Sequence, residues 1–137
     1  MFEYKTKLEL ISKKYKLDLL VLFGSRAKNT NKLDSDWDFA FYREKKLNVS
    51  EEMSLWEEIV ALISNEKVDL VNLNTHSSPK LRYEIFEFGK CIYERKKNFF
   101  ERFKSESKMI YLESKQRYSD LAKEFLRKNL LSMKNGL

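Results

Sequence analysis

The sequence predicts an α/β fold of the α+β type, with a small mixed sheet of about three or four strands flanked by helices. Short apolar runs alternate along the chain with segments whose apolar residues recur at helical spacing. Leu19–Phe23 is continuously apolar, which is typical of a strand buried on both faces. The segment from Asn98 to Lys134 contains neither glycine nor proline. A helical C-terminal tail, as one long helix or two shorter ones, therefore completes the fold.

The first part of the chain is predicted to form a helix, a strand, a short helix and a second strand. Apolar residues three or four positions apart define the first helix, and alternation of aspartate with aromatic residues defines the second strand. In order, the elements are a helix carrying Tyr4, Leu8, Ile11 and Tyr15, the strand Leu19–Phe23, a short helix from Ser25 to about Lys28, a polar loop at 29–35 and a strand from Asp36 to Tyr42.

The next part is predicted to continue as helix, strand, helix and strand. A charged connection leads to Ser50, a candidate N-cap that precedes two glutamates. Ser78 and Pro79 are a typical helix start, and Gly89 is a typical helix stop. The elements are a helix with a buried stripe of Met53, Trp56, Val60 and Ile63, a strand at Val68–Leu73, a helix at about 79–88 and a short strand at Cys91–Tyr93.

Length and composition indicate a single globular domain. The chain has 137 residues, of which 35% are charged and 42% are hydrophobic. It has no apolar run of membrane-spanning length and no signal peptide, so we expect a cytoplasmic protein. Cys91 is the sole cysteine, which excludes an intrachain disulfide and a thiolate metal cluster, and we expect it to be a buried small hydrophobe.

The net charge of +6 is unevenly distributed. Residues 1–94 hold 15 basic and 16 acidic side chains, whereas residues 95–137 hold 12 basic and 5 acidic ones. We therefore divide the chain into a core at 1–94 and a basic helical extension at 95–137. Such an extension can dock on an acidic partner, or it can be a solvated flank that only aids solubility.

The clearest chemical signal is a Gly-Ser pair followed, ten residues later, by two aspartates. Asp36 and Asp38 are two positions apart, so on a strand both carboxylates project from one face and Trp37 projects from the other. Adjacent carboxylates repel each other unless a cation neutralises them, which indicates a divalent metal site. Gly24 and Ser25 can offer backbone N–H groups and a hydroxyl to phosphate oxygens.

This pattern resembles the signature of the nucleotidyltransferase superfamily related to DNA polymerase beta. The flanking segments 22–27 and 35–39 are similar to its minimal nucleotidyltransferase (MNT) branch. The resemblance runs from about Tyr15 to Glu94 and is closest to the MntA-type antitoxins of HEPN/MNT toxin–antitoxin pairs. It implies a nucleotidyltransferase fold.

The resemblance also implies a set of site residues. Asp69 matches the position of a third metal-binding carboxylate on a neighbouring strand. Asp36 and Asp38 would then bridge two Mg²⁺ ions, and Asp69 would hold the ion nearer the acceptor and help to remove its hydroxyl proton. Gly24 and Ser25 would bind the phosphates of ATP. Arg26 would neutralise phosphate charge, or it is merely solvated.

The function that the resemblance implies is transfer of AMP from ATP to a tyrosine of a cognate HEPN ribonuclease toxin, which neutralises the toxin. Two alternatives stay open, namely an aminoglycoside-type nucleotidyltransferase for small molecules and a non-catalytic antitoxin that acts by binding. Direct nucleic-acid binding ranks low, because the chain has no recognised RNA- or DNA-binding motif.

Other polar and aromatic residues are given structural roles. Asp34 precedes the strand and is expected in a turn, and His76 is expected on the surface. Lys80 and Arg82 are expected as charges on a helix surface. Tyr111, Tyr118 and Phe125, spaced by seven, suggest a helix seam rather than a platform for stacking bases.

Overall fold

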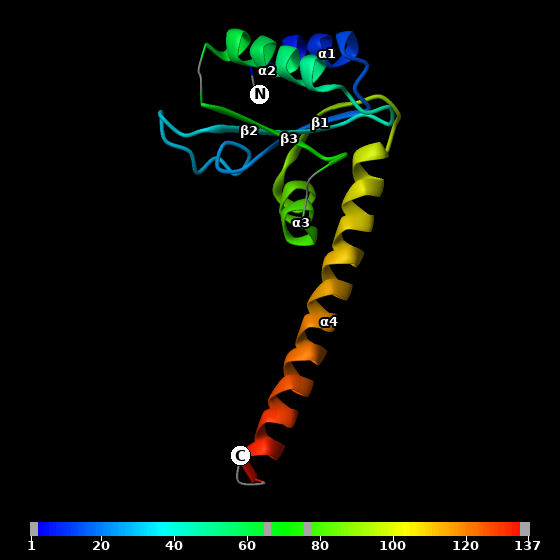
Figure 1. Cartoon of the computed structure of the whole chain (residues 1–137). Coiled ribbons are helices and arrows are strands. Elements are labelled where there is room, and N and C mark those ends of the chain that lie inside the picture. The colour runs from blue at the N-terminus through cyan, green and yellow to red at the C-terminus, as the bar shows by residue number, and fades with distance from the viewer. Residues whose placement is uncertain (1–2, 65–66, 76–77, 135–137) are drawn as a thin grey trace.

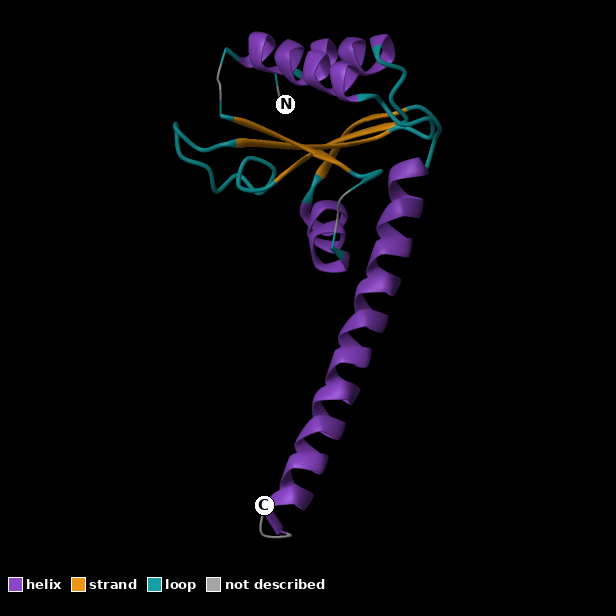
Figure 2. Cartoon of the chain, viewed as in Figure 1, coloured by secondary structure: helices purple, strands orange, loops and turns teal. Residues whose placement is uncertain are grey.

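The computed structural model describes residues 3–64, 67–75 and 78–134. Figures 1 and 2 show a sheet with α1 and α2 on one face, and with α3 and the start of α4 on the other. Most of α4 projects away from this body as a single rod. The elements are α1 (Lys5–Lys14), β1 (Leu19–Phe23), β2 (Trp37–Tyr42), α2 (Val49–Ile63), β3 (Val68–Asn72), α3 (Pro79–Phe88), β4 (Lys90–Glu94) and α4 (Phe99–Lys134).

The sheet is mixed, as predicted, with the strand order β3-β2-β1-β4. β1 pairs in antiparallel fashion with both β2 and β4, whereas β2 and β3 run parallel. Parallel neighbours need a crossover connection, and α2 supplies it between β2 and β3. β1 therefore lies in the middle of the sheet, and four of its five residues are buried, as its continuous apolar run predicts.

The two faces of the sheet carry separate hydrophobic clusters. Phe39 and Phe41 of β2 are fully buried in the cluster under α1 and α2, against which Trp37 also packs. Ala40 lies on the opposite face, in the cluster formed with α3 and the start of α4. Because side chains alternate along a strand, Asp38 shares the face of Ala40, as predicted.

The boundaries of α2 and α3 follow from their caps. Ser50 was the wrong N-cap for α2: Asn48 accepts a hydrogen bond from the Glu51 backbone at 2.8 Å, and the Glu51 side chain accepts one from the Asn48 backbone at 3.0 Å. This reciprocal pair satisfies two exposed N–H groups, which one serine could not do. In α3, the predicted start at Ser78 and Pro79 and the stop at Gly89 are confirmed.

One other expectation about the helices was partly wrong and a second was wrong. In α2 the predicted Ile63 is buried and Trp56 and Val60 pack against the core, but Met53 is 53% exposed. The fully buried positions Leu55 and Ile59 were not predicted, so the helix is rotated relative to the predicted stripe. Residues 25–29 form consecutive turns rather than a short helix. Asn29 adopts a left-handed conformation with a φ of 57°, which prevents propagation of helical hydrogen bonds beyond it.

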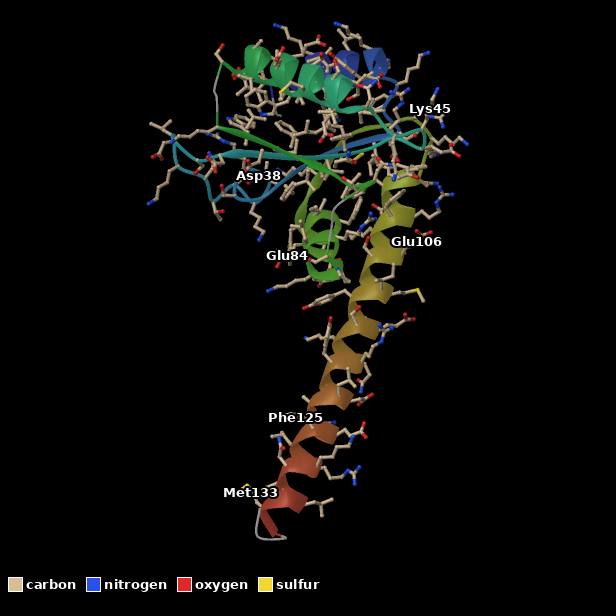
Figure 3. All side chains as sticks on the ribbon, viewed as in Figure 1. Asp38, Lys45, Glu84, Glu106, Phe125 and Met133 are labelled. Carbon is tan, nitrogen blue, oxygen red and sulfur yellow. The ribbon has the colours of Figure 1, made fainter. Side chains whose placement is uncertain are left out.

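Helix α4 is continuous, and only its beginning packs against the rest of the molecule. Phe100 and Ser107 are buried, and the ring of Tyr111 stacks on that of Tyr83 in α3 with centroids 4.6 Å apart. Beyond Tyr111, the other two residues of the predicted helix seam are not packed against the rest of the chain: Tyr118 is 72% exposed and Phe125 is 64% exposed. Figure 3 shows the labelled Phe125 and Met133 on this projecting part. Among the described residues, no helix is both long and apolar enough to cross a membrane.

Cys91 lies in β4, as predicted, but it is only partly buried. Burial is nevertheless the main reason why the pKa of its thiol rises to about 12. The thiol is therefore protonated at neutral pH and behaves as an apolar packing group.

Candidate active site

The sheet register brings two of the three predicted carboxylates side by side. Asp38 is the second residue of β2 and lies directly opposite Asp69 of the parallel strand β3. Asp36 lies just before β2, which begins at Trp37 rather than at Asp36 as predicted. Asp36 and Asp69 are exposed, and Asp38, which Figure 3 labels, is half-buried on the interior strand β2.

The Gly-Ser turn meets the same carboxylate from the neighbouring strand. Phe23, the last residue of β1, pairs with Asp38 across the antiparallel ladder, so Gly24 begins the turn beside it. Gly24 has a φ of 75°, a conformation that side chains disfavour. A Cβ atom here would lie 3.1 Å from Cγ of Asp38 and closer still to its Oδ2. The Gly24 turn, which we predict to bind phosphate, is therefore in van der Waals contact with Asp38 of the predicted metal site.

Replacing Gly24 with Ala should impair both folding and catalysis. The new methyl group would meet the Asp38 carboxylate and would force a left-handed residue, so we expect a loss of at least about 1–3 kcal/mol in the free energy of unfolding. Chemical denaturation measures this loss, and Mg-dependent ATP binding should weaken in parallel. The control is Ser119→Ala on the exposed part of α4, which should change neither property. A Gly24→Ala protein that bound ATP normally would contradict the predicted turn.

Asp69 and Asp36 act electrostatically on Asp38. The pKa of Asp38 is raised, first by desolvation and then by the negative charges of Asp69 and Asp36. Such mutual repulsion is a cost that a bound cation would remove. The donor set is all oxygen, which suits Mg²⁺.

Within the described ranges, no group of three or more histidine, cysteine, aspartate or glutamate side chains is gathered closely enough to hold a metal ion by itself. Mg²⁺ in nucleotide sites commonly takes only one or two protein carboxylates and completes its shell with water and substrate phosphates. The residues present therefore fit an ion that arrives with a nucleotide better than a preformed, fully protein-coordinated centre.

Arg26 has a clear role, which differs from the expected contact with phosphate. Its guanidinium lies 4.1 Å from the centre of the Trp37 ring. It also donates hydrogen bonds to the carbonyl oxygen of Ser35 at 2.9 and 3.2 Å and to that of Leu33 at 3.3 Å. Arg26 thus ties the turn after Gly24 to the residues that flank the aspartates. We call this arrangement of Arg26, Trp37 and the Ser35 carbonyl the clasp. The contact of Arg26 with phosphate stays a prediction.

If the clasp stabilises the fold, a lysine at position 26 should not restore the stability that Arg26 provides. A lysine keeps the positive charge but lacks the planar fork that stacks and donates at the same time. We expect Arg26→Lys and Arg26→Gln to lower the free energy of unfolding by similar amounts, about 1–3 kcal/mol. Trp37→Phe, which keeps an aromatic face, should cost less than Trp37→Ala. If Arg26→Lys were fully stable and active while Arg26→Gln lost ATP binding, phosphate neutralisation would be the role of Arg26 instead.

The structure also places the remaining polar residues. Asp34 is in an exposed turn, as predicted. Lys80 is an exposed surface charge, as predicted. The same prediction was wrong for Arg82, which is partly buried and donates a hydrogen bond to the carbonyl oxygen of Leu73. Burial lowers the pKa of the Arg82 guanidinium. His76 lies outside the described residues. Sequence reasoning missed Lys67, whose carbonyl accepts from the Trp37 backbone at 2.8 Å and so aligns β3 beside Asp38. No local pattern at position 67 signals this contact.

A Gly-Ser turn beside strand aspartates on a mixed sheet defines a nucleotidyltransferase-type site. The chain belongs to the polymerase beta nucleotidyltransferase family, which matches residues 6–98. It is similar to the protein adenylyltransferase MntA of Aphanizomenon flos-aquae (strain 2012/KM1/D3). The two are 35% identical over 105 residues, which cover 70% of this chain and 69% of the relative. The family resemblance indicated by the motif is therefore confirmed.

Solved structures share the fold. A crystal structure of a toxin–antitoxin pair with AMP-PNP matches with a TM-score of 0.73 at 22% identity, over 89% of this chain and 98% of that chain. A chain in the structure of a tri-AMPylated Shewanella oneidensis HEPN toxin in complex with MNT antitoxin matches with a TM-score of 0.69 at 20% identity, over 90% of this chain and 97% of that chain. The predicted nucleotidyltransferase fold is thus confirmed.

Proposed function

We propose that this chain is an antitoxin that transfers AMP from ATP to a tyrosine of a cognate HEPN ribonuclease and thereby neutralises it. The observation that carries the proposal is the contact of the Gly24 turn with Asp38, which lies beside Asp69 in the sheet. Two facts about relatives support a HEPN protein as the acceptor of AMP. A curated relative is a protein adenylyltransferase, and an MNT antitoxin of the same fold occurs with a tri-AMPylated HEPN toxin.

The proposed reaction is an in-line displacement at the α-phosphorus of ATP. The tyrosine oxygen forms a bond to this phosphorus, the bond from the α-phosphorus to the oxygen that bridges it to the β-phosphorus breaks, and pyrophosphate leaves with the electron pair. Backbone N–H groups of the turn and the Ser25 hydroxyl hold the β- and γ-phosphates, so the α-phosphate faces the acceptor. Asp69, which is exposed at the sheet edge, takes the proton of the tyrosine hydroxyl.

We assign two Mg²⁺ ions to the site, held by Asp36, Asp38 and Asp69. When bound, they would supply positive charge that stabilises the transferring phosphoryl group and the leaving pyrophosphate. The raised pKa of Asp38 supports this assignment, because the neighbouring charges of Asp69 and Asp36 disfavour its ionised form and a bound cation would remove that cost. It also argues against a non-catalytic antitoxin with a vestigial site.

The exposure of the site favours a protein acceptor over a small molecule. Asp36 and Asp69 are both exposed, and the described residues between 3 and 94 form no second lobe that could enclose an aminoglycoside. We infer that residues 1–94 form the catalytic core. The extension at 95–137 begins by packing on α3, and α4 then projects away from the core, so we assign its exposed part to docking on the partner. Because the proposed partner is a ribonuclease, we place the reaction in the cytoplasm.

The direct test is intact-mass analysis of the partner. A neighbouring reading frame that encodes a small helical protein with an Arg-x4–6-His motif identifies the partner to be purified. Incubation with this protein, ATP and Mg²⁺ should increase the partner's mass by whole AMP units on tyrosine and release pyrophosphate. Chelation of the metal should prevent the increase. An unmodified partner that still binds tightly would favour the non-catalytic alternative, and AMP transfer to an aminoglycoside alone would favour the small-molecule enzyme.

A further inference from the structure

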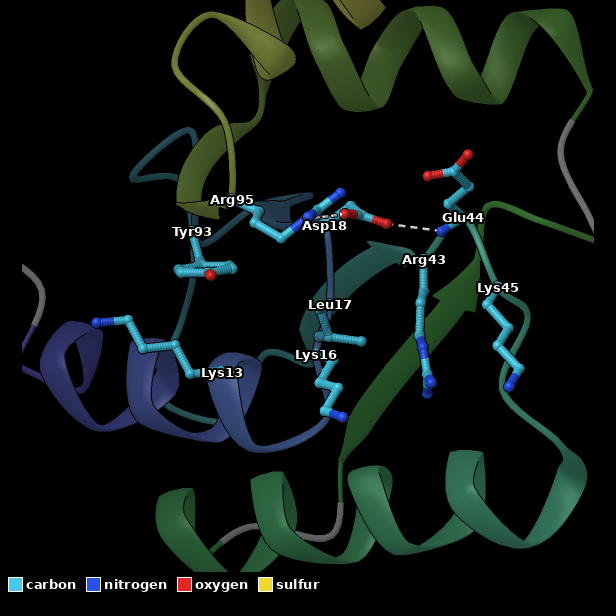
Figure 4. Close-up of a pocket in the computed structure, with 9 residues that line it drawn as sticks. All are labelled: Lys13, Lys16, Leu17, Asp18, Arg43, Glu44, Lys45, Tyr93 and Arg95. Atoms are coloured by element: carbon cyan, nitrogen blue, oxygen red, sulfur yellow. Dashed lines mark hydrogen bonds and ion pairs between the residues drawn. The ribbon is translucent and has the colours of Figure 1, made fainter.

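A concave site lies at the end of the sheet opposite the aspartates. Figure 3 shows Lys45 at this end and Asp38 at the other. The pocket has a volume of about 390 Å³, which is within the range of small-molecule sites. Figure 4 shows residues from three segments around it: the end of α1, the loop after β2 and the end of β4. Its cationic side chains are Lys13, Lys16, Arg43, Lys45 and Arg95.

The floor of this pocket is fixed by a buried carboxylate. Asp18 is 4% exposed, accepts a hydrogen bond from the Glu44 backbone at 2.6 Å and pairs with the Arg95 guanidinium. The Arg95 backbone also donates to the Asp18 carbonyl at 3.0 Å. Asp18 therefore joins the start of β1 to the two loops that carry the basic residues. A pocket held in this way is preorganised, which lowers the entropic cost of binding.

The pocket has more basic side chains than nearby acidic side chains can neutralise. Arg95 is paired with Asp18, and Arg43 lies 3.5 Å from Glu51. Within the part of the chain that the structure describes, Lys13, Lys16 and Lys45 have no ion-pair partner. Glu44 is the only other acidic residue that lines the pocket. Like charges gathered around one concave space repel one another, so an anion bound there would be stabilised by several cations at once.

We propose that this pocket binds a small molecule that carries two or more phosphate groups. Several cationic residues that line one pocket from separate segments match an anion of multiple charge better than a single carboxylate. Arg43 has a side chain that is only 16% exposed, and its planar guanidinium can donate two parallel hydrogen bonds to phosphate oxygens. The partly exposed ring of Tyr93 adds an apolar surface, against which an organic group attached to the phosphates can lie.

This site is separate from the catalytic one. The strand β1 lies between Asp18 and Gly24, and its five residues span roughly 16 Å at about 3.3 Å per residue. No residue of the basic pocket belongs to the Gly24 turn or to the three site aspartates. The inference therefore goes beyond adenylyl transfer and does not depend on it.

Calorimetric titration of the full chain with inorganic pyrophosphate, in EDTA and at physiological ionic strength, tests the proposal. EDTA keeps the metal-dependent catalytic site from contributing. Lys13→Gln/Lys16→Gln should raise the Kd at least about tenfold. The matched control, Lys123→Gln/Lys128→Gln, removes the same charge from the projecting part of α4 and should change the Kd less than about twofold. Circular dichroism checks that all variants are folded.

Each possible result supports or contradicts binding of phosphate groups in this pocket. Equal weakening in both double variants, or no binding by the unaltered chain, would overturn the proposal. Loss of metal-free binding in Asp36→Asn would also overturn it, because pyrophosphate would then occupy the catalytic site. That result would leave adenylyl transfer itself untouched, and intact-mass analysis of the partner tests transfer separately. ATP that binds more tightly than tripolyphosphate would support a nucleotide as the ligand, and equal binding would support a bare polyphosphate.

Discussion

Replacing Asp38 with Asn should reduce AMP transfer at least about a thousandfold while the fold survives. The loss follows because the substitution removes the carboxylate that lies between the Gly24 turn and Asp69 and that we assign to both metal ions. Single-turnover transfer to the partner, followed by intact mass, measures the effect. Asp36→Asn should be similarly severe. Asp69→Asn should lower turnover more than it weakens ATP binding, because its proposed task concerns the acceptor.

The same substitution should stabilise the metal-free protein. The pKa of Asp38 is raised in the folded state, so the folded chain binds its proton more readily than the unfolded chain does. The stability of the metal-free protein therefore falls as the pH rises from the ordinary range of an aspartate through the raised folded value. At neutral pH the ionised Asp38 is a net cost, and Asp38→Asn removes this cost. Its Tm without metal should exceed that of the unaltered protein.

The control for both effects is Asp34→Asn. This variant loses one carboxylate from an exposed turn close to the site, but not from the sheet. We expect normal transfer and an unchanged Tm from it. Full activity in both Asp36→Asn and Asp38→Asn would show that these residues do not hold the metal. An Asp38→Asn protein that unfolded would instead assign Asp38 a structural role.

Removing the exposed part of α4 should abolish productive contact with the partner. A protein that ends at Tyr111 keeps the helix turns that pack on α3, including buried Ser107 and the stacked Tyr111. A cut directly after Ser107 would remove this ring contact and is therefore less suitable. The shortened protein should remain folded and bind Mg-ATP. It should lose at least about a hundredfold in the rate of transfer to the partner at limiting concentration.

Two double variants separate the contributions of apolar contact and charge in this segment. Tyr118→Ser/Phe125→Ser removes two exposed rings and should mainly raise the dissociation rate. Lys123→Gln/Lys128→Gln should mainly lower the association rate, and salt should diminish the difference from the unaltered protein. Surface plasmon resonance against the partner measures both rates. Transfer at the full rate by the protein that ends at Tyr111 would show that the distal part of α4 is not the docking segment.

The strands and the chemistry of the candidate site were predictable because they depend on local patterns. A continuous apolar run identified β1, and alternating aspartate and aromatic residues placed Asp38 and Phe39 on opposite faces of β2. The caps of α3 were also local signals. The N-cap of α2 was predictable in principle, because Asn48 and Glu51 have the spacing of a capping box.

Other features depended on contacts between distant segments. The rotation of α2, which buries Leu55 and Ile59, is set by packing against the sheet, because its apolar residues permit more than one stripe. The clasp between Arg26 and Trp37 joins residues whose separation in sequence follows no periodic rule. The pairing of Asp38 with Asp69 requires the crossover through α2 to place β3 parallel to β2.

The sequence by itself determined which residues could perform chemistry: a glycine that tolerates a left-handed turn, and aspartates that alternate with core residues. Only the tertiary structure decided how they meet. It brought the Gly24 turn against Asp38, and it gathered basic residues from three segments into a pocket around Asp18. The reason is physical. Secondary structure and side-chain direction follow from neighbours a few residues away, whereas distances between elements follow from burying both faces of one sheet.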